Sequence, residues 1–198
     1  MFFIRQQLEE LEKTDWPTTR EPDFEDFWNR AVTRGEAHDP RSEAVPLKDY
    51  PYDYVRVFDV TVHGLDGTPV KAWLYLPGDA DRNHPVPGVA FFHGGQGSRG
   101  KWPCGALPYV LAGCAVLQTE FRLQGGVTSS MTPMRRCANS FATNNLDRPS
   151  PEENYFYHAF TDQLLMVKYL FSRPEVDASH VAVMGASQGG GTSLIMAA

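Results

Sequence analysis

A serine enclosed by glycines near the end of the sequence has the spacing of a hydrolase nucleophile. The segment Gly185-Ala186-Ser187-Gln188-Gly189 fits the pattern G-x-S-x-G, with a β-rich run before it and small residues after it. In that context the serine lies on a sharp strand-to-helix turn, the nucleophile elbow, with its hydroxyl exposed. Gly185 and Gly189 suit such a turn because a Cβ atom there would collide with neighbouring backbone. The pattern predicts Ser187 as a catalytic nucleophile; the alternative is a glycine-rich turn that only allows tight helix packing.

Two backbone amides are candidates for stabilising the oxyanion that forms when such a serine attacks a carbonyl group. The first is the N–H of Gln188, because the residue after the nucleophile supplies this donor in hydrolases with the same turn. The second is the N–H of Gly95, in the segment His93-Gly94-Gly95 that closes an earlier apolar run. We interpret His93 as a brace of this loop rather than as a catalytic base.

The acid and the histidine that complete such a site do not follow the serine. All six histidines precede Ser187, and the 11 residues after it include no histidine, aspartate or glutamate. In α/β-hydrolases the order along the chain is serine, then acid, then histidine. We therefore expect these 198 residues to form the N-terminal part of an α/β-hydrolase fold, through the nucleophile elbow, truncated at the C-terminus.

Composition excludes several classes of function. Lys and Arg total 18 against 24 Asp and Glu, so a formal net charge of −6 disfavours nucleic acid and anionic lipid as partners. The sequence contains no apolar run long enough for a membrane helix. Its first apolar stretch gives way to polar residues too early for a signal peptide, so we expect a cytoplasmic protein. Cys104, Cys114 and Cys137 are an odd number without a C-x-x-C pair, which favours reduced thiols over disulfides or a metal site.

Hydrophobic periodicity predicts the elements that must position the serine. The expected elements are amphipathic helices within 1–38, a β-hairpin over 54–76 with its turn at 64–67, buried strands at 86–92 and 115–119, a short helix at 107–112, a crossover helix over 155–171, a strand over 180–185 and a helix from 189. A strand, helix, strand order implies a right-handed parallel crossover and hence an α/β sheet.

The same pattern divides the chain into two parts. We expect residues 1–50 to form an N-terminal helical segment packed on the sheet, and residues 51–198 to form the N-terminal portion of the α/β-hydrolase domain. The polar, turn-rich stretch 125–154 is long for a loop, which favours a functional or partner-covered segment.

Some residues allow both a functional and a structural interpretation. Arg135-Arg136 fits an anionic-substrate contact, although two solvated charges are the simpler interpretation. Asp162 is expected to be a solvated or first-turn helix acid, not a triad member, because it precedes the serine. Four aromatic residues have a ring that suits a sugar site, while core packing is the more common role of such residues. They are Trp73, Trp102, Tyr109 and Phe121.

Several stretches together resemble the acetyl xylan esterase and cephalosporin C deacetylase family, carbohydrate esterase family 7. The matching segments are Arg20–Trp28, Phe91–Gly95, Tyr155-Phe156-Tyr157, Arg173–Asp177 and Gly185–Gly191, so the resemblance spans most of the chain. Arg122-Leu123-Gln124 occupies the position of the family's R-G-Q motif, with Leu123 where the family has glycine. Gly95 stands where the family commonly has tyrosine.

The resemblance implies a serine esterase that removes acetyl groups from acetylated xylo-oligosaccharides or other small acetyl esters. It implies Ser187 as nucleophile, Arg122 and Gln124 as support of the active site, no metal or organic cofactor, and a homo-oligomer, commonly a hexamer. Two alternatives stay open at this point. One is a catalytically incomplete fragment or pseudo-hydrolase with a binding role, and the other is an oligopeptidase-like α/β-hydrolase.

Overall fold

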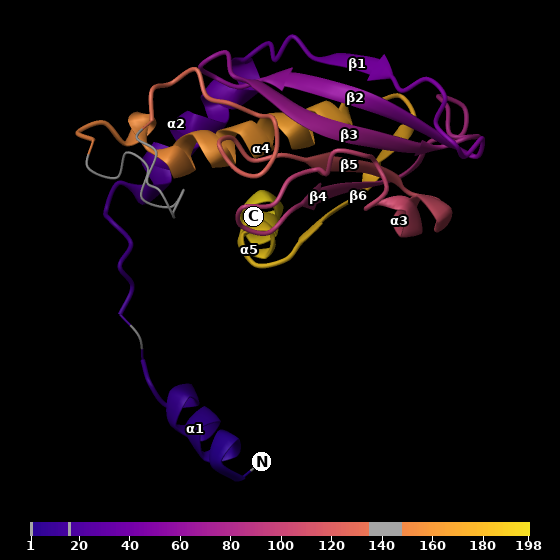
Figure 1. Cartoon of the computed structure of the whole chain (residues 1–198). Helices are drawn as coiled ribbons and strands as arrows, with labels where there is room; N and C mark the ends of the chain where they lie inside the picture. The colour runs from indigo at the N-terminus through magenta and orange to yellow at the C-terminus, as the bar shows by residue number, and fades with distance from the viewer. Residues whose placement is uncertain (1, 16, 135–147) are drawn as a thin grey trace. The chain divides into compact units, whose positions relative to one another are not determined.

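Six strands form one mixed sheet in the computed structural model, which describes residues 2–15, 17–134 and 148–198. The strands are β1 (Glu43–Pro46), β2 (Val55–His63), β3 (Pro69–Pro77), β4 (Val86–Phe92), β5 (Ala115–Thr119) and β6 (Val176–Gly185). Their order across the sheet is β1-β2-β3-β5-β4-β6, from the top of the molecule downward in Figure 1. The chain divides into two compact units, residues 1–31 and 32–198, and the sheet belongs to the second.

The antiparallel half of the sheet follows from alternating residues. β2 and β3 pair from Val55 opposite Pro77 to His63 opposite Pro69, which confirms the predicted hairpin. Successive side chains of a strand point to opposite faces of the sheet. Val55 and Val57 of β2 therefore pack into one core, and Val60 and Val62 pack into the core on the other face. The short edge strand β1 was not predicted, since four mostly exposed residues ending in proline carry no alternating pattern.

The parallel half of the sheet carries the predicted crossover. β4 pairs in parallel with β5 and with β6, and the ends of β4 and β6 lie side by side, with Phe92 opposite Gly185. β6 begins at Val176 rather than at the predicted His180, and a register shift between Pro87 and Gly88 accommodates the longer strand. The carboxyl ends of both strands therefore meet at one edge of the sheet, where α/β folds place their sites.

Helices cover both faces of the sheet. The helices of this unit include α3 (Leu107–Leu111), α4 (Tyr155–Phe171) and α5 (Gln188–Ala197). α4 packs over the larger core, which contains Leu74, Phe92 and Leu117. α3 packs over a second core on the other face, around Trp73 and Tyr75. The boundaries of α4 match the predicted helix 155–171, because its apolar stripe and its Asn154 cap, which accepts from the N–H of Phe156, both lie in local sequence.

The N-terminal unit contains α1 (Phe2–Glu12) and the start of α2 (Phe24–Ala37). α2 begins where Pro22-Asp23 predicts a helix start, with the N–H of Phe27 donating to the carbonyl of Asp23 at 2.9 Å. Glu25 and Asp26 lie in its first turn, where carboxylates interact favourably with the helix dipole. Within the second unit, the Lys168 ammonium donates to the carbonyls of Gly35, Glu36 and His38 at the other end of this helix.

Candidate active site

Ser187 lies on the turn between β6 and α5 in a strained backbone conformation. Its φ is +54° and its ψ is −120°, a combination that non-glycine residues rarely adopt. The N–H of Gly191 donates to the carbonyl of Ser187 at 3.0 Å, so the first turn of α5 holds the serine in place. The side chain is exposed at the carboxyl-terminal edge of the sheet. Strain of this kind, which costs about 1–3 kcal/mol, concentrates at functional sites.

The glycines on either side of Ser187 are required by close backbone contacts. A Cβ atom on Gly189 would lie 2.1 Å from the carbonyl oxygen of Phe92, and one on Gly185 would lie 2.5 Å from the carbonyl carbon of Gly189. Both distances are far below van der Waals contact, and the obstructing atoms belong to backbone. The glycines of the G-x-S-x-G pattern are therefore needed because this turn packs closely against the end of β4.

The loop after β4 lies against the serine turn. A Cβ atom built on Gly94 would lie 3.8 Å from Cβ of Ser187. The imidazole of His93 donates through Nδ1 to the carbonyl of Gly94 at 2.7 Å. Its Nε2 accepts from the N–H of Phe121 at 3.2 Å. Burial lowers the pKa of His93, which keeps the ring neutral in this role. The bracing role predicted for His93 matches these contacts, since both ring nitrogens are engaged with backbone.

Gln124 connects the loop after β4 to the serine turn. Its Oε1 accepts from the backbone N–H of Gln96 at 2.8 Å, and its Nε2 donates to Oε1 of Gln188 at 3.0 Å. The same Nε2 lies 2.7 Å from the hydroxyl of Tyr155, which donates to the carbonyl of Arg122. Burial is the main cause that raises the pKa of Tyr155 to about 12, so the phenol remains a donor at neutral pH. Gln96 follows Gly95, so one side chain holds both segments that carry the candidate oxyanion amides.

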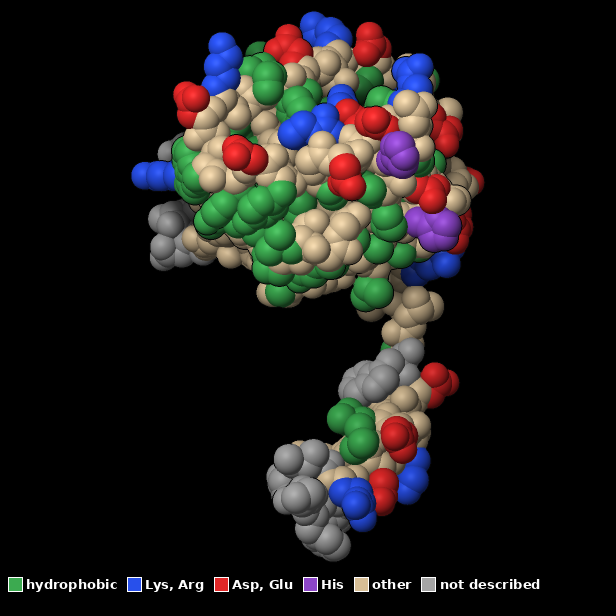
Figure 2. All heavy atoms as spheres, turned by 90° about the vertical axis from the view of Figure 1, so that its right-hand side faces the viewer, with side chains coloured by type: hydrophobic (Ala, Val, Ile, Leu, Met, Phe, Trp, Pro, Cys, Tyr) green, Lys and Arg blue, Asp and Glu red, His purple; other side chains and the backbone are tan. Residues whose placement is uncertain are grey.

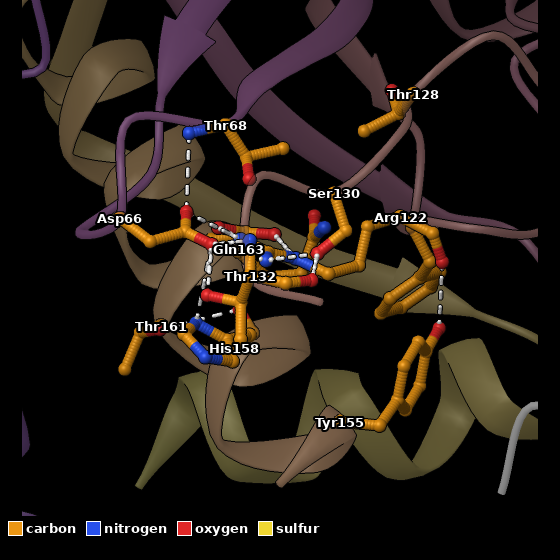
Figure 3. Close-up of polar contacts among 12 residues, drawn as sticks. Asp66, Thr68, Arg122, Thr128, Ser130, Thr132, Tyr155, His158, Thr161 and Gln163 are labelled. Carbon is orange, nitrogen blue, oxygen red and sulfur yellow. Dashed lines mark hydrogen bonds and ion pairs between the residues drawn. The ribbon is translucent and has the colours of Figure 1, made fainter. Parts of the chain in front are cut away.

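Arg122 lies fully buried beneath this connection and bridges two carboxylates. It donates through Nε and Nη2 to Asp162 on α4, both at 2.8 Å, and through Nη1 to Asp66 in the hairpin turn at 2.8 Å. Figure 3 shows Asp66, Thr132 and His158 gathered around the guanidinium. Burial alone would lower the pKa of Arg122, but the two carboxylates raise it and keep the group charged.

The two carboxylates were not recognised as partners of Arg122 from sequence. Burial disfavours the charge of Asp66, but hydrogen bonds from Arg122 and Thr132 outweigh burial and hold its pKa well below the usual range. Asp162 is 1% exposed, so the expectation that it is a solvated or first-turn acid was wrong. In the sequence Asp66 signals only a turn and Asp162 only a helix position, so no local pattern marks either as a partner.

Leu123 departs from the family pattern at a position where glycine is favoured. Its φ is +59°, in the left-handed region, where a non-glycine residue costs about 1 to 2 kcal/mol. The N–H of Leu123 donates to the carbonyl of Thr128 at 2.9 Å, and its side chain packs against the larger core. This backbone conformation is a physical reason for glycine in the R-G-Q motif, and packing offsets its cost here.

A second grouping of serine, histidine and aspartate lies near the start of β6 and does not form a relay. Nδ1 of His180 lies 2.7 Å from Asp177 and 3.0 Å from the hydroxyl of Ser179. A relay requires the acid on one ring nitrogen and the serine on the other, whereas here both contact the same nitrogen. These residues therefore form a hydrogen-bonded surface cluster in the first half of β6.

The remaining candidates are distributed over the core, the surface and the undescribed segment. Trp73 and Phe121 are buried, whereas Trp102 is exposed. Cys104 and Cys114 are free thiols. Arg135, Arg136 and Cys137 lie outside the described residues.

In the ranges 2–15, 17–134 and 148–198, no three His, Cys, Asp or Glu side chains are grouped so that they would hold a metal ion. Over those residues, none of the helices has the length and apolar character needed to cross a membrane.

Comparison with known proteins agrees with this arrangement. The family model described as acetyl xylan esterase (AXE1) matches residues 1–198. An acetyl xylan esterase from Paenibacillus sp. R4 superposes with a TM-score of 0.87 at 31% identity, covering 96% of this chain and 60% of its own length. Acetyl xylan esterase 1 from Thermoanaerobacterium sp. JW/SL YS485 gives a TM-score of 0.84 at 29% identity, covering 96% and 58%.

The chain thus spans about 60% of the length of these solved relatives. The sheet order, the crossover helix and the serine turn agree with the α/β-hydrolase fold predicted from sequence. The family match extends over every element described above, from α1 to α5. This chain belongs to the acetyl xylan esterase (AXE1) family.

Proposed function

We propose that this chain supplies the nucleophile and the oxyanion-binding amides of a serine esterase. The observation that carries the proposal is the conformation of Ser187, at φ +54° on a turn whose flanking glycines pass within contact of β4. The proposed substrates are acetylated xylo-oligosaccharides or related small acetyl esters, which follows from the family and from the names of its solved relatives.

In the proposed reaction, Oγ of Ser187 attacks the acetyl carbonyl carbon while a general base takes the hydroxyl proton. The amides of Gln188 and Gly95 donate to the oxyanion of the tetrahedral intermediate. The intermediate collapses to an acetyl-enzyme and releases the sugar hydroxyl with the proton from the base. Water then attacks the acetyl-enzyme by the same route, giving acetate and free Ser187.

The general base and its acid are proposed to come from outside these 198 residues. No histidine or carboxylate follows Ser187 in the sequence, whereas α/β-hydrolases take both from that part of the chain. Without them a serine hydroxyl is a weak nucleophile. The same observation favours a second candidate function, in which the 198-residue chain binds acetylated sugars without cleaving them.

The test is the intact mass of the natural protein after exposure to a fluorophosphonate. This reagent transfers its phosphonyl group to an activated serine, with loss of fluoride. A protein whose mass before labelling is well above 22.2 kDa and which gains one adduct, absent in Ser187→Ala, would support the esterase. Ser179→Ala is the matched control, because Ser179 also contacts a histidine but lies near the start of β6, so the adduct on Ser187 should remain in this variant. An unmodified species of 22.2 kDa would instead favour the binding role.

A further inference from the structure

A buried arginine anchors the loop that carries the Gly95 amide. Arg99 lies four positions after Gly95 and is 6% exposed. Its Nη1 donates to Oδ1 of Asp59 on β2 and to the carbonyl of Ala72 on β3, both at 2.7 Å. The guanidinium lies over the ring of Trp73, with 3.9 Å between Cζ and the ring centroid. These contacts fasten the loop after β4 to β2 and β3.

The residue after this arginine contacts the same indole ring. Nε1 of Trp73 donates to the carbonyl of Gly100 at 3.1 Å. Trp73 therefore holds two consecutive residues of the loop, one against its face and one at its edge. The attraction between a cation and a ring face is larger where water is excluded. Trp73 and Arg99 are both buried, so the contact is shielded from solvent.

Glu120 connects Arg99 to the loop after β5. Its side chain is 2% exposed, and its Oε1 lies 3.5 Å from Nε of Arg99. Its Oε2 accepts from the N–H groups of Val127 and Thr128, both at 3.0 Å, and from the hydroxyl of Thr128 at 2.8 Å. A Cβ atom on Gly126 would lie 2.2 Å from Cδ of Glu120, so the chain passes directly over the carboxylate. The ion pair thus joins the anchors of the two loops.

The same two loops are linked again closer to the serine turn. The N–H of Gly125 donates to the carbonyl of Gly97 at 3.0 Å, and the side chain of Gln124 accepts from the N–H of Gln96. Gln96 has a φ of +61°, a conformation that persists in a non-glycine residue only when the surrounding structure imposes it. Gln96 and Gly97 lie between the candidate oxyanion amide and Arg99, so contacts on both sides of them fix the path of the loop.

Stability alone does not account for a buried ion pair at this place. On the face of the molecule drawn in Figure 2, acidic and basic side chains lie at the surface, where water solvates them. Arg99 and Glu120 are instead removed from water. Replacing a buried ion pair by apolar side chains of similar volume is often neutral or stabilising. What the charged groups add is direction, because each donor has to point at an acceptor.

We propose that Arg99 is a positioning residue for the oxyanion amide of Gly95. The proposal rests on the proposed function, since it concerns the same site. The guanidinium holds the loop after β4 beside the serine turn before substrate binds, so the amide is in place when the oxyanion forms. Arg99 acts through the loop and not on the reacting atoms, because its contacts are with Asp59, Trp73 and Glu120.

The test is steady-state kinetics of the natural protein and its variants on a small acetyl ester. Arg99→Met should lower kcat by about 10- to 100-fold and change KM by less than about threefold, because a displaced oxyanion donor affects the transition state most. Arg99→Lys should recover part of the loss, since an ammonium group can pair with Asp59 but cannot lie flat on Trp73.

Arg173→Met is the matched control. Arg173 also pairs with a carboxylate, that of Glu175, and lies over an aromatic ring, that of Tyr169, but it follows α4. This variant should keep the kcat of the unchanged protein. Unfolding midpoints of all variants ensure that each is folded at the assay temperature. If Arg99→Met does not fold, Trp73→Phe replaces it, because phenylalanine keeps a ring face and loses the hydrogen bond to Gly100.

Amide hydrogen exchange supplies a second measurement that needs no catalytic activity. In Arg99→Met the amides of Gln96 and Gly97 should exchange about tenfold faster or more, because the loop that contains them has lost its anchor. Arg173→Met should leave both amides as protected as in the unchanged protein.

Four results would overturn the proposal. They are an unchanged kcat in folded Arg99→Met, a rise in KM alone, an equal fall of kcat in Arg173→Met, and unchanged exchange of the Gln96 and Gly97 amides. Absence of both ester cleavage and fluorophosphonate labelling in the unchanged protein would instead refute the esterase. Hydrogen exchange would still decide whether Arg99 holds the loop, so the two proposals fail separately.

Discussion

Gln124 donates a hydrogen bond through Nε2 to Oε1 of Gln188, with a distance of 3.0 Å. The two residues are 64 positions apart and meet because their segments follow β5 and β6, the two parallel strands that flank β4, at the same edge of the sheet. Since Gln124 also accepts from the N–H of Gln96, it links the loop that carries the Gly95 amide to the side chain of Gln188.

Gln124→Leu should lower kcat of the proposed esterase by roughly 10- to 100-fold with little change in KM, because misplaced oxyanion donors affect the transition state most. Steady-state kinetics on an acetyl ester measures this split. Gln118→Leu is the control, since Gln118 also makes a buried amide contact, accepting from the hydroxyl of Tyr75, but in the second core. Equal kcat in Gln124→Leu and the unchanged enzyme would refute the positioning role.

Gly189→Ala should destabilise the fold by roughly 3 kcal/mol or more, because the new methyl group meets backbone that cannot move without disrupting β4. Gly191→Ala, two residues on in the same helix, should instead stabilise by about 1 kcal/mol, since alanine is the better helix former. A Cβ atom at Gly191 meets nothing within 4 Å. Urea unfolding of both variants measures the contrast, and similar midpoints would contradict the geometry of the turn.

Arg122→Met should cost roughly 3–5 kcal/mol, because it leaves Asp66 and Asp162 without their shared cation. Arg20→Met removes a surface pair with Glu25, whose side chains are 48% and 65% exposed, and should cost less than about 1 kcal/mol. Chemical unfolding at neutral pH compares the two. A loss in Arg122→Met no larger than in Arg20→Met would show that the buried network adds little stability.

The contribution of His158 to the stability of the fold should fall as pH decreases from about 6.5 to about 4. Burial, helped by repulsion from Arg122, lowers its pKa to about 4 against the attraction of Asp66, whose Oδ2 lies 3.9 Å from Nδ1. His158 binds a proton near pH 6.5 in the unfolded chain but only near pH 4 in the folded chain. Protonation of His158 therefore favours unfolding, by roughly 3 kcal/mol. Above pH 6.5 both states are neutral and the contribution vanishes.

Unfolding free energies at several pH values test this in His158→Gln and in His84→Gln. His158→Gln should flatten the decline between pH 6.5 and 4, whereas His84→Gln should retain it because the His84 side chain is 81% exposed. The contribution of Asp66, whose pKa is lowered, is lost only at lower pH, so the two effects occupy different ranges. An unchanged slope in His158→Gln would assign the decline to other groups.

Elements with local signals are predictable from the amino-acid sequence. The alternation over the hairpin, the apolar stripe and cap of α4 and the G-x-S-x-G turn each lie within a short window, and the structure places them as predicted. The side-chain period depends only on neighbouring residues, and the G-x-S-x-G pattern is a short motif, so both are readable without tertiary structure. β1 had no such signal, and only its pairing with β2 defines it.

Only the tertiary structure decided which distant residues became partners. Arg122 could have been a solvated cation, but the fold brings Asp66 and Asp162 to it from 56 and 40 positions away. Trp102 joins Tyr50 in the same way, across the loop after β4. Such contacts depend on strand order and on the packing of helices over each face, which no local pattern encodes, because the energy of a buried pair exists only once both groups are brought together and removed from water.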